Sequence, residues 1–164
     1  MSCPRLYGIL MLCSTLLATA CGIVAVIATL PIAAAGFCWG GKHLLLLGAE
    51  TEEVDGKPLF EVGYAAHPSF VEFPGEFERL VRPVSFAIGD KDNQVPLEQA
   101  MKVKEIVEAK PEGQTGELVI YEGCSHGFAV RADPSYADLS KQVEAAENQA
   151  IHWFDTHLGL SSTS

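Results

Sequence analysis

The segment Gly36-Phe37-Cys38-Trp39-Gly40 decides how this 164-residue sequence is interpreted. An apolar run over residues 31–37 predicts a buried strand before it, and Lys42 to Leu47 is apolar enough for a helix after it. Glycines two residues before and two after Cys38 suit a sharp turn from strand to helix, where larger side chains would collide. At such a turn the helix dipole favours a Cys38 thiolate, and the Trp39 N–H can point at a developing oxyanion. The alternative is a buried structural cysteine in a glycine-rich turn.

The rest of the chain alternates predicted strands and helices. Short apolar runs predict strands at residues 62–66, 84–88 and 117–121. Apolar residues at helical spacing predict helices at 97–109 and 136–158, and residues 50–58 read as a polar loop. This alternation predicts an α/β fold, with a mostly parallel sheet flanked by helices. We expect one folded domain over residues 31–160 and a disordered tail at 161–164.

Reactive side chains follow two of these strands. Asp92 comes shortly after the second, with Asp90 as a possible substitute, and His126 lies in a glycine-containing loop after the third. Because the carboxyl ends of parallel strands share one edge of a sheet, both are expected near Cys38. An aspartate can hold the tautomer of a histidine that deprotonates a nucleophile. Taken singly, each has a simpler explanation: a solvated acidic turn, or an ordinary surface histidine.

Charge and cysteine content exclude several functions. The formal net charge is −10, which argues against a nucleic-acid partner, because phosphates require clustered Lys and Arg. The five cysteines form no C-x-x-C pair, so neither a disulfide framework nor a zinc site is predicted from their spacing. A reducing compartment suits such a set.

The N-terminal residues have a composition of their own. No charged residue occurs from Leu6 to Gly41, a run longer than the roughly 20 residues that cross a bilayer. Arg5 before this run and Ala18-Thr19-Ala20 within it resemble a signal peptide. Residues 1–30 are therefore either a targeting or anchor segment or sequence foreign to the fold. Membrane contact is expected only through residues 6–30, and the protein would be secreted or membrane-anchored if they are a genuine signal.

Residues 31–158 resemble the dienelactone hydrolase family, especially its fungal-type members. The blocks that carry the resemblance are residues 36–42, 66–70, 89–96, 126–131 and 153–158. The resemblance implies a Cys38, Asp92 and His126 triad that cleaves small ester or enol-lactone substrates through an acyl-cysteine, without metal or organic cofactor, in the cytoplasm. It places His67 near the pocket, where a structural His-Pro turn is the alternative. Arg131 resembles an anion-holding arginine of bacterial members, although it lies one residue further from the histidine.

The resemblance also implies that strands normally found before the nucleophile strand are missing. We therefore expect the C-terminal half of an α/β-hydrolase fold, with the nucleophile strand as an apolar edge. The second oxyanion donor would be missing too, so the chain is predicted to be weakly active or inactive. The competing hypothesis is a non-catalytic, membrane-tethered or interaction protein that carries a pseudoenzyme domain.

Overall fold

The computed structural model describes residues 31–49, 53–54, 56–130 and 137–159. The predicted N-terminal segment 1–30, the tail 161–164 and Arg131 lie outside the described residues.

A four-stranded parallel sheet forms the centre of the fold. Its strands are β1 (Ala33–Phe37), β4 (Val62–Ala66), β5 (Val84–Lys91) and β6 (Glu117–Ser125), in the order β1-β4-β5-β6. All three neighbouring pairs are parallel, as the alternation predicts. The last two strands extend three and four residues beyond the predicted ends, and Asp90 thereby becomes part of β5. Within the described sheet β1 is an edge strand, as the family resemblance implied, and its residues are mostly half-buried. The prediction of a fully buried strand at this position is therefore wrong.

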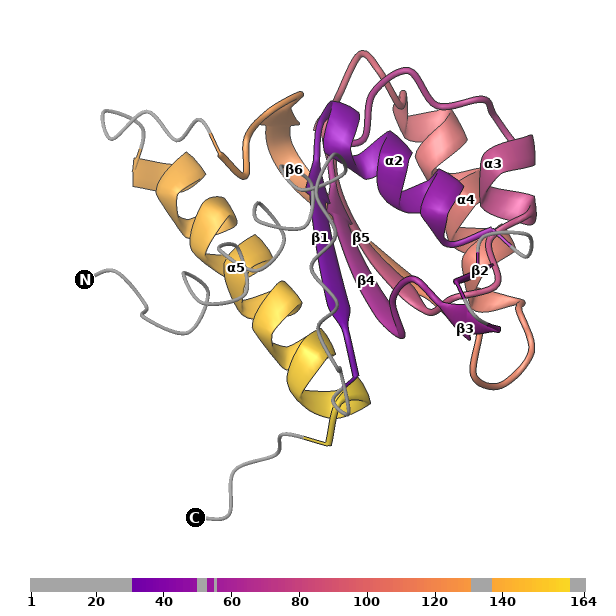
Figure 1. The fold of residues 1–164 in the computed structure, drawn as a ribbon. Coiled ribbons are helices and arrows are strands. Elements are labelled where there is room, and N and C mark those ends of the chain that lie inside the picture. The colour runs from indigo at the N-terminus through magenta and orange to yellow at the C-terminus, as the bar shows by residue number, and fades with distance from the viewer. Residues whose placement is uncertain (1–30, 50–52, 55, 131–136, 160–164) are drawn as a thin grey trace.

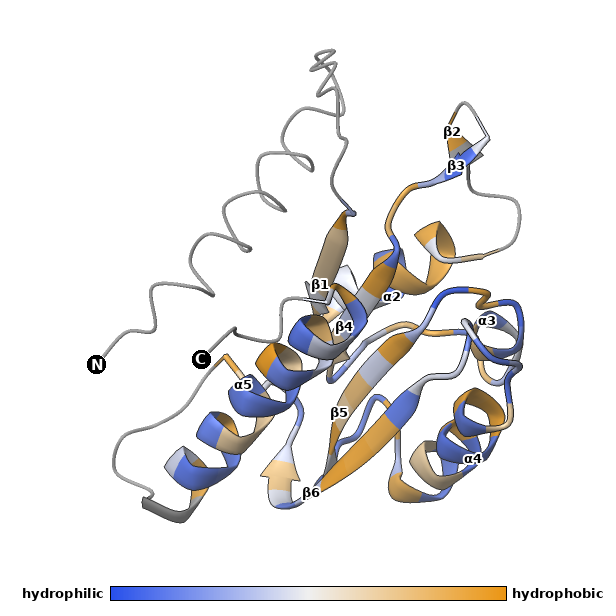
Figure 2. Ribbon diagram, turned by 90° about the horizontal axis from the view of Figure 1, so that it is seen from below, coloured by the Kyte–Doolittle hydropathy of each residue, from blue (hydrophilic) through white to orange (hydrophobic). Residues whose placement is uncertain are grey.

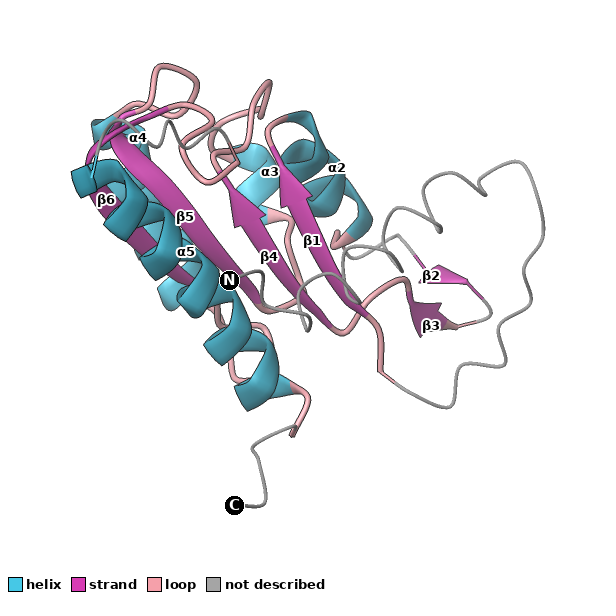
Figure 3. Cartoon of the chain, turned by 90° about the vertical axis from the view of Figure 1, so that its left-hand side faces the viewer, coloured by secondary structure: helices cyan, strands magenta, loops and turns pink. Residues whose placement is uncertain are grey.

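Helices cover both faces of this sheet (Figures 1 and 3). The predicted helices are present as α2 (Trp39–Leu47), α4 (Leu97–Glu108) and α5 (Ala137–His157). Helices α2 and α4 lie on one face together with α3 (Gly75–Glu78), and α5 lies alone on the other. The sequence analysis did not predict α3, because four residues are too few to show helical periodicity.

The segment predicted as a polar loop contains a small hairpin. Strands β2 (Glu53–Val54) and β3 (Lys57–Pro58) pair antiparallel, apart from the main sheet. With two residues each, these strands carry no alternation pattern that a sequence analysis can detect.

Two apolar clusters hold the layers together. One packs α2, α3 and α4 against the sheet and is centred on Leu45, Phe77 and Phe86. The other packs α5 against the opposite face through Tyr64 and Phe154. Helices α4 and α5 show hydrophobic and hydrophilic positions interspersed along their length, as expected of helices with one buried face (Figure 2). In the part of the chain that the structure describes, no helix combines the length and apolarity needed to span a membrane.

Candidate active site

Cys38 lies at the tight turn between β1 and α2. Its backbone has φ 50° and ψ −118°, a conformation that side-chain-bearing residues rarely adopt. The turn is held by hydrogen bonds from the Cys38 N–H to the Ala66 carbonyl (3.3 Å) and from the Gly41 N–H to the Cys38 carbonyl (3.1 Å). Cys38 occupies the N-cap position of α2, so it lies at a helix N-terminus as predicted, although its side chain makes no capping hydrogen bond. This strained strand–turn–helix geometry is typical of a nucleophile elbow.

The glycines around the turn differ in what they allow. A Cβ on Gly36 would lie 2.4 Å from the carbonyl oxygen of Gly40, so Gly36 is required, as predicted. For Gly40 the prediction is wrong, because a Cβ there would meet no described atom within 4 Å. The following residue, Gly41, is the constrained one: its Cβ would lie 2.8 Å from Cβ of Pro68. Because α2 packs closely on Pro68 after β4, the position that requires glycine is residue 41 and not residue 40.

Asp92 and His126 are brought together at the same edge of the sheet. The Nδ1 atom of His126 lies 3.2 Å from both carboxylate oxygens of Asp92. Asp92 is buried, and its Oδ1 also accepts hydrogen bonds from the N–H groups of Gln94 (2.7 Å) and Val95 (3.3 Å). These contacts fix the carboxylate so that it holds the histidine proton on Nδ1 and leaves the Nε2 lone pair available.

Asp90 has a different task. Its Oδ1 accepts a hydrogen bond from the Gly123 N–H at 2.7 Å, in the segment that leads to His126. The register between β5 and β6 shifts between Gly89 and Lys91, an irregularity of the kind that redirects side chains near sites. Of the two aspartates, Asp92 therefore contacts the histidine, and Asp90 links β5 to Gly123 near the end of β6, three residues before His126.

His67 is the residue in closest polar contact with the nucleophile. Its Nδ1 lies 3.4 Å from the Cys38 sulfur, and the whole residue is 0% exposed. It follows β4 with φ 40°, and its N–H donates to the Ala87 carbonyl at 2.8 Å. The sequence analysis placed His67 near the pocket, but not against the sulfur. The position of His67 directly after a strand, like that of Cys38, is the sequence feature that could have predicted its contact with the sulfur.

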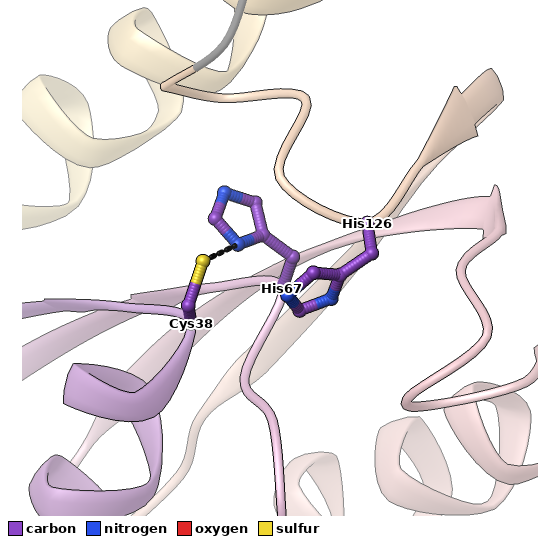
Figure 4. Close-up of side chains that lie close together, drawn as sticks. All are labelled: Cys38, His67 and His126. Carbon is purple, nitrogen blue, oxygen red and sulfur yellow. Dashed lines mark hydrogen bonds between the residues drawn. The ribbon is translucent and has the colours of Figure 1, made fainter.

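Cys38, His67 and His126 form a compact cluster, called the Cys-His-His cluster below. The sulfur and one nitrogen from each ring lie within 4.8 Å of one another, and the two rings pack edge to face with centroids 5.2 Å apart. Figure 4 shows the three side chains converging from different parts of the fold. His126 is 19% exposed at its side chain and Cys38 is half-buried, so solvent reaches one side of the cluster. This arrangement can present a thiolate to a small electrophile and transfer protons beside it.

Trp39 begins α2, directly after the nucleophile. Its N–H belongs to the first turn, where backbone donors lack acceptors within the helix. Trp39 is 62% exposed, and its indole ring packs on the ring of His43, with centroids 4.1 Å apart. The oxyanion role of the Trp39 N–H stays a prediction, while the Trp39 side chain lies at the surface.

An ion pair anchors the nucleophile helix. The Lys42 Nζ lies 2.6 Å from Oε1 of the buried Glu76 in α3. The other carboxylate oxygen of Glu76 accepts the Glu72 N–H at 3.0 Å. Because one partner is buried and both oxygens are hydrogen-bonded, this pair fixes α2 relative to α3.

A parallel sheet with a strained cysteine elbow and an Asp–His pair at its carboxyl edge is the architecture of an α/β-hydrolase. The sequence profile of the dienelactone hydrolase family matches residues 23–158, and the chain belongs to this family. It is 32% identical over 127 residues to hydrolase tropI of Talaromyces stipitatus, an alignment covering 77% of this chain and 46% of the relative. Hydrolase pyvD of Aspergillus violaceofuscus is 28% identical over 127 residues, covering 77% and 48%.

Solved structures agree on the fold. A Klebsiella pneumoniae protein, described as a candidate dienelactone hydrolase, superposes with a TM-score of 0.57 at 22% identity, covering 74% of this chain and 50% of that one. Esterase 2 of Thermogutta terrifontis, with propionate bound, gives a TM-score of 0.53 at 20% identity, covering 73% and 55%. The chain spans about half the length of the curated relatives it matches.

Proposed function

We propose that this chain carries the hydrolytic centre of a cysteine-dependent hydrolase that acts on small carboxylic esters or enol-lactones. The observation that carries the proposal is the convergence of the Cys38 sulfur and the His126 ring, with Asp92 held against the far side of that ring. Membership of the dienelactone hydrolase family supports the substrate class.

In the proposed reaction, His126 takes the Cys38 thiol proton and the sulfur attacks the ester carbonyl carbon. The Trp39 N–H donates to the resulting oxyanion. The carbon–oxygen bond then breaks, and His126 returns its proton to the leaving oxygen. Water, deprotonated by His126, hydrolyses the acyl-cysteine and regenerates the thiol. Asp92 stabilises the imidazolium that forms twice in this cycle.

His67 has a positioning role in this proposal. The Cys38 sulfur lies 3.4 Å from the His67 Nδ1, a contact that holds the sulfur beside the two imidazoles. In the proposed cycle the thiol proton goes to His126, whose ring is partly exposed and contacts the Asp92 carboxylate. The anion-holding role of Arg131 stays a prediction, because Arg131 lies outside the described residues. The cytoplasmic location also stays a prediction.

Exposed apolar residues close in sequence to the cluster members support a small apolar substrate. Trp39, Phe70 and Val130 are all largely exposed, and each lies within four residues of a cluster member along the chain. Among the described residues the Trp39 N–H is the one oxyanion donor that we assign. Because loss of one oxyanion donor typically lowers the rate by about a hundredfold to a thousandfold, we propose that a chain relying on this single donor hydrolyses esters slowly.

Hydrolysis of an aryl acetate and of a dienelactone by purified variants tests the proposal. Cys38→Ser and His126→Asn should abolish the enzymatic rate, and Asp92→Asn should lower kcat by about 10³ to 10⁴, as loss of the correct tautomer does in serine proteases. Cys124→Ala is the matched control, because this cysteine is buried within β6, outside the Cys-His-His cluster, and its replacement should leave the rate unchanged. An unchanged rate in Cys38→Ala would sink the cysteine mechanism.

Thiol labelling gives a second readout that needs no substrate. Burial raises the pKa of the Cys124 thiol, so iodoacetamide should modify Cys124 slowly near neutral pH. Cys38 is half-buried at a helix N-terminus and should be modified faster. A chain whose Cys38 reacts no faster than Cys124 and that turns over neither ester would fit the pseudoenzyme hypothesis instead.

A further inference from the structure

The Cys-His-His cluster has the donor set of a transition-metal site. We propose that Cys38, His67 and His126 bind one Zn²⁺ ion, with the thiolate and two imidazole nitrogens as ligands. The cysteine spacing had predicted no zinc site, because these ligands are 29 and 59 residues apart and belong to no sequence motif. Thiolate and imidazole are the ligands that Zn²⁺ prefers in proteins.

The separations between donor atoms suit tetrahedral zinc. Zinc–sulfur and zinc–nitrogen bonds of about 2.3 Å and about 2.05 Å place a sulfur and a nitrogen ligand about 3.6 Å apart. The Cys38 sulfur and the His67 Nδ1 are already 3.4 Å apart. All three donor atoms lie within 4.8 Å of one another, so small side-chain shifts, with His126 kept in contact with Asp92, bring them to zinc-binding distance. Three protein ligands leave a fourth position for water, on the side that solvent reaches.

The residues around the cluster complete a metal site. Asp92 accepts the His126 Nδ1 proton, which leaves Nε2 to face the metal, as in carboxylate–histidine–zinc arrangements. His67 is fixed from its buried side by the rings of Phe37 and Phe128, with centroids 6.1 Å and 5.8 Å away. Two of the three ligands are therefore already oriented by neighbours, which lowers the entropy lost when the ion binds.

Binding would form a bond from zinc to the Cys38 sulfur, and the thiol proton would pass to the buffer. The site itself does not depend on the proposed hydrolase activity. One consequence does rest on it: Zn²⁺ occupies the sulfur and the His126 lone pair that acyl transfer requires, so the ion acts as a reversible inhibitor.

Calorimetric titration of Zn²⁺ into the full chain tests the site without any substrate, so its failure is distinct from failure of the proposed activity. The protein used for the titration carries serine in place of Cys3, Cys13 and Cys21, so that these three thiols cannot bind the ion. The Cys-His-His cluster is unchanged. One ion should bind per chain. Asp92→Asn should weaken binding about 10- to 100-fold, and Cys38→Ser should weaken it further.

Two controls and a spectrum make the test decisive. Cys124→Ser and His43→Gln change the same residue types outside the cluster and should leave the affinity unchanged. Co²⁺ bound to the unmutated cluster should show a thiolate charge-transfer band that alkylation of Cys38 removes. The proposal is overturned if Zn²⁺ shows no saturable one-to-one binding, if Cys38→Ser binds it as tightly as the parent, or if the Co²⁺ complex lacks the thiolate band.

Discussion

Two neighbouring glycines give a matched test of how the nucleophile elbow is packed. Gly40 and Gly41 are consecutive residues in the first turn of α2, and each can be changed to alanine. An added Cβ meets nothing described within 4 Å at Gly40, whereas at Gly41 it lies 2.8 Å from Cβ and 3.0 Å from Cα of Pro68. The two substitutions therefore add the same methyl group to open space and to a filled contact.

The expected difference follows from these contacts. Alanine in place of a helical glycine gains up to about 1 kcal/mol at either position. At Gly41 that gain is opposed by an overpacking cost of about 1–3 kcal/mol, because Pro68 must move. The two variants should therefore differ in the free energy of unfolding by about 1–3 kcal/mol, with Gly40→Ala the more stable. For a chain of this length that is roughly 3 to 9 °C in Tm.

Thermal unfolding followed by circular dichroism measures this difference directly. Because Pro68 follows His67, Gly41→Ala should also slow alkylation of Cys38, while Gly40→Ala should not. Equal melting temperatures for the two variants, or a more stable Gly41→Ala, would refute the steric argument and return the requirement to Gly40.

Three further predictions concern stability, substrate binding and pH. Glu76→Gln should destabilise the fold by about 1–3 kcal/mol in urea unfolding, because Lys42 loses a buried charged partner; a loss under 0.5 kcal/mol would make the pair unimportant. Phe70→Ala should raise KM for an aryl ester severalfold and leave kcat and Tm unchanged, because Phe70 is 73% exposed. A fall in kcat alone would contradict a role in substrate binding. Burial, then Glu117, raises the pKa of Tyr121 to about 12. The Tyr121 hydroxyl therefore holds its proton more tightly in the folded state than in the unfolded state. The stability that this contributes is present below pH 10 and is lost between pH 10 and pH 12. In denaturant titrations, Tyr121→Phe should make this decline in the free energy of unfolding less steep.

Local patterns were sufficient for the fold class and for placing the candidate site residues at strand ends. The strands at 62–66, 84–88 and 117–121 were predicted because buried parallel strands appear as short apolar runs between turn residues. Their order along the chain then placed Cys38, Asp92 and His126 at one edge, since parallel strands end on the same side. The family was recognised from blocks that surround the same strand ends, and the profile match over residues 23–158 agrees.

Contacts between distant segments could not be predicted in this way. Asp90 contacts Gly123 and Asp92 contacts His126 because the register shift between β5 and β6 directs the two carboxylates to different partners. The role of Gly41 depends on Pro68, which lies 27 residues away along the chain. The hydrophobic pattern of the sequence predicts neither the register shift nor the Gly41–Pro68 contact, because both form only when strands and helices pack.

The amino-acid sequence by itself determined the four strands of the main sheet, the three long helices and the reactive side chains that follow the strands, because propensity, hydrophobic period and turn chemistry act over a few neighbouring residues. Tertiary structure alone decided that a buried imidazole lies 3.4 Å from the Cys38 sulfur and that a second ring completes a three-donor cluster. Distances of that kind are set by how β1, β4 and β6 are assembled in one sheet, and therefore by packing across the whole fold.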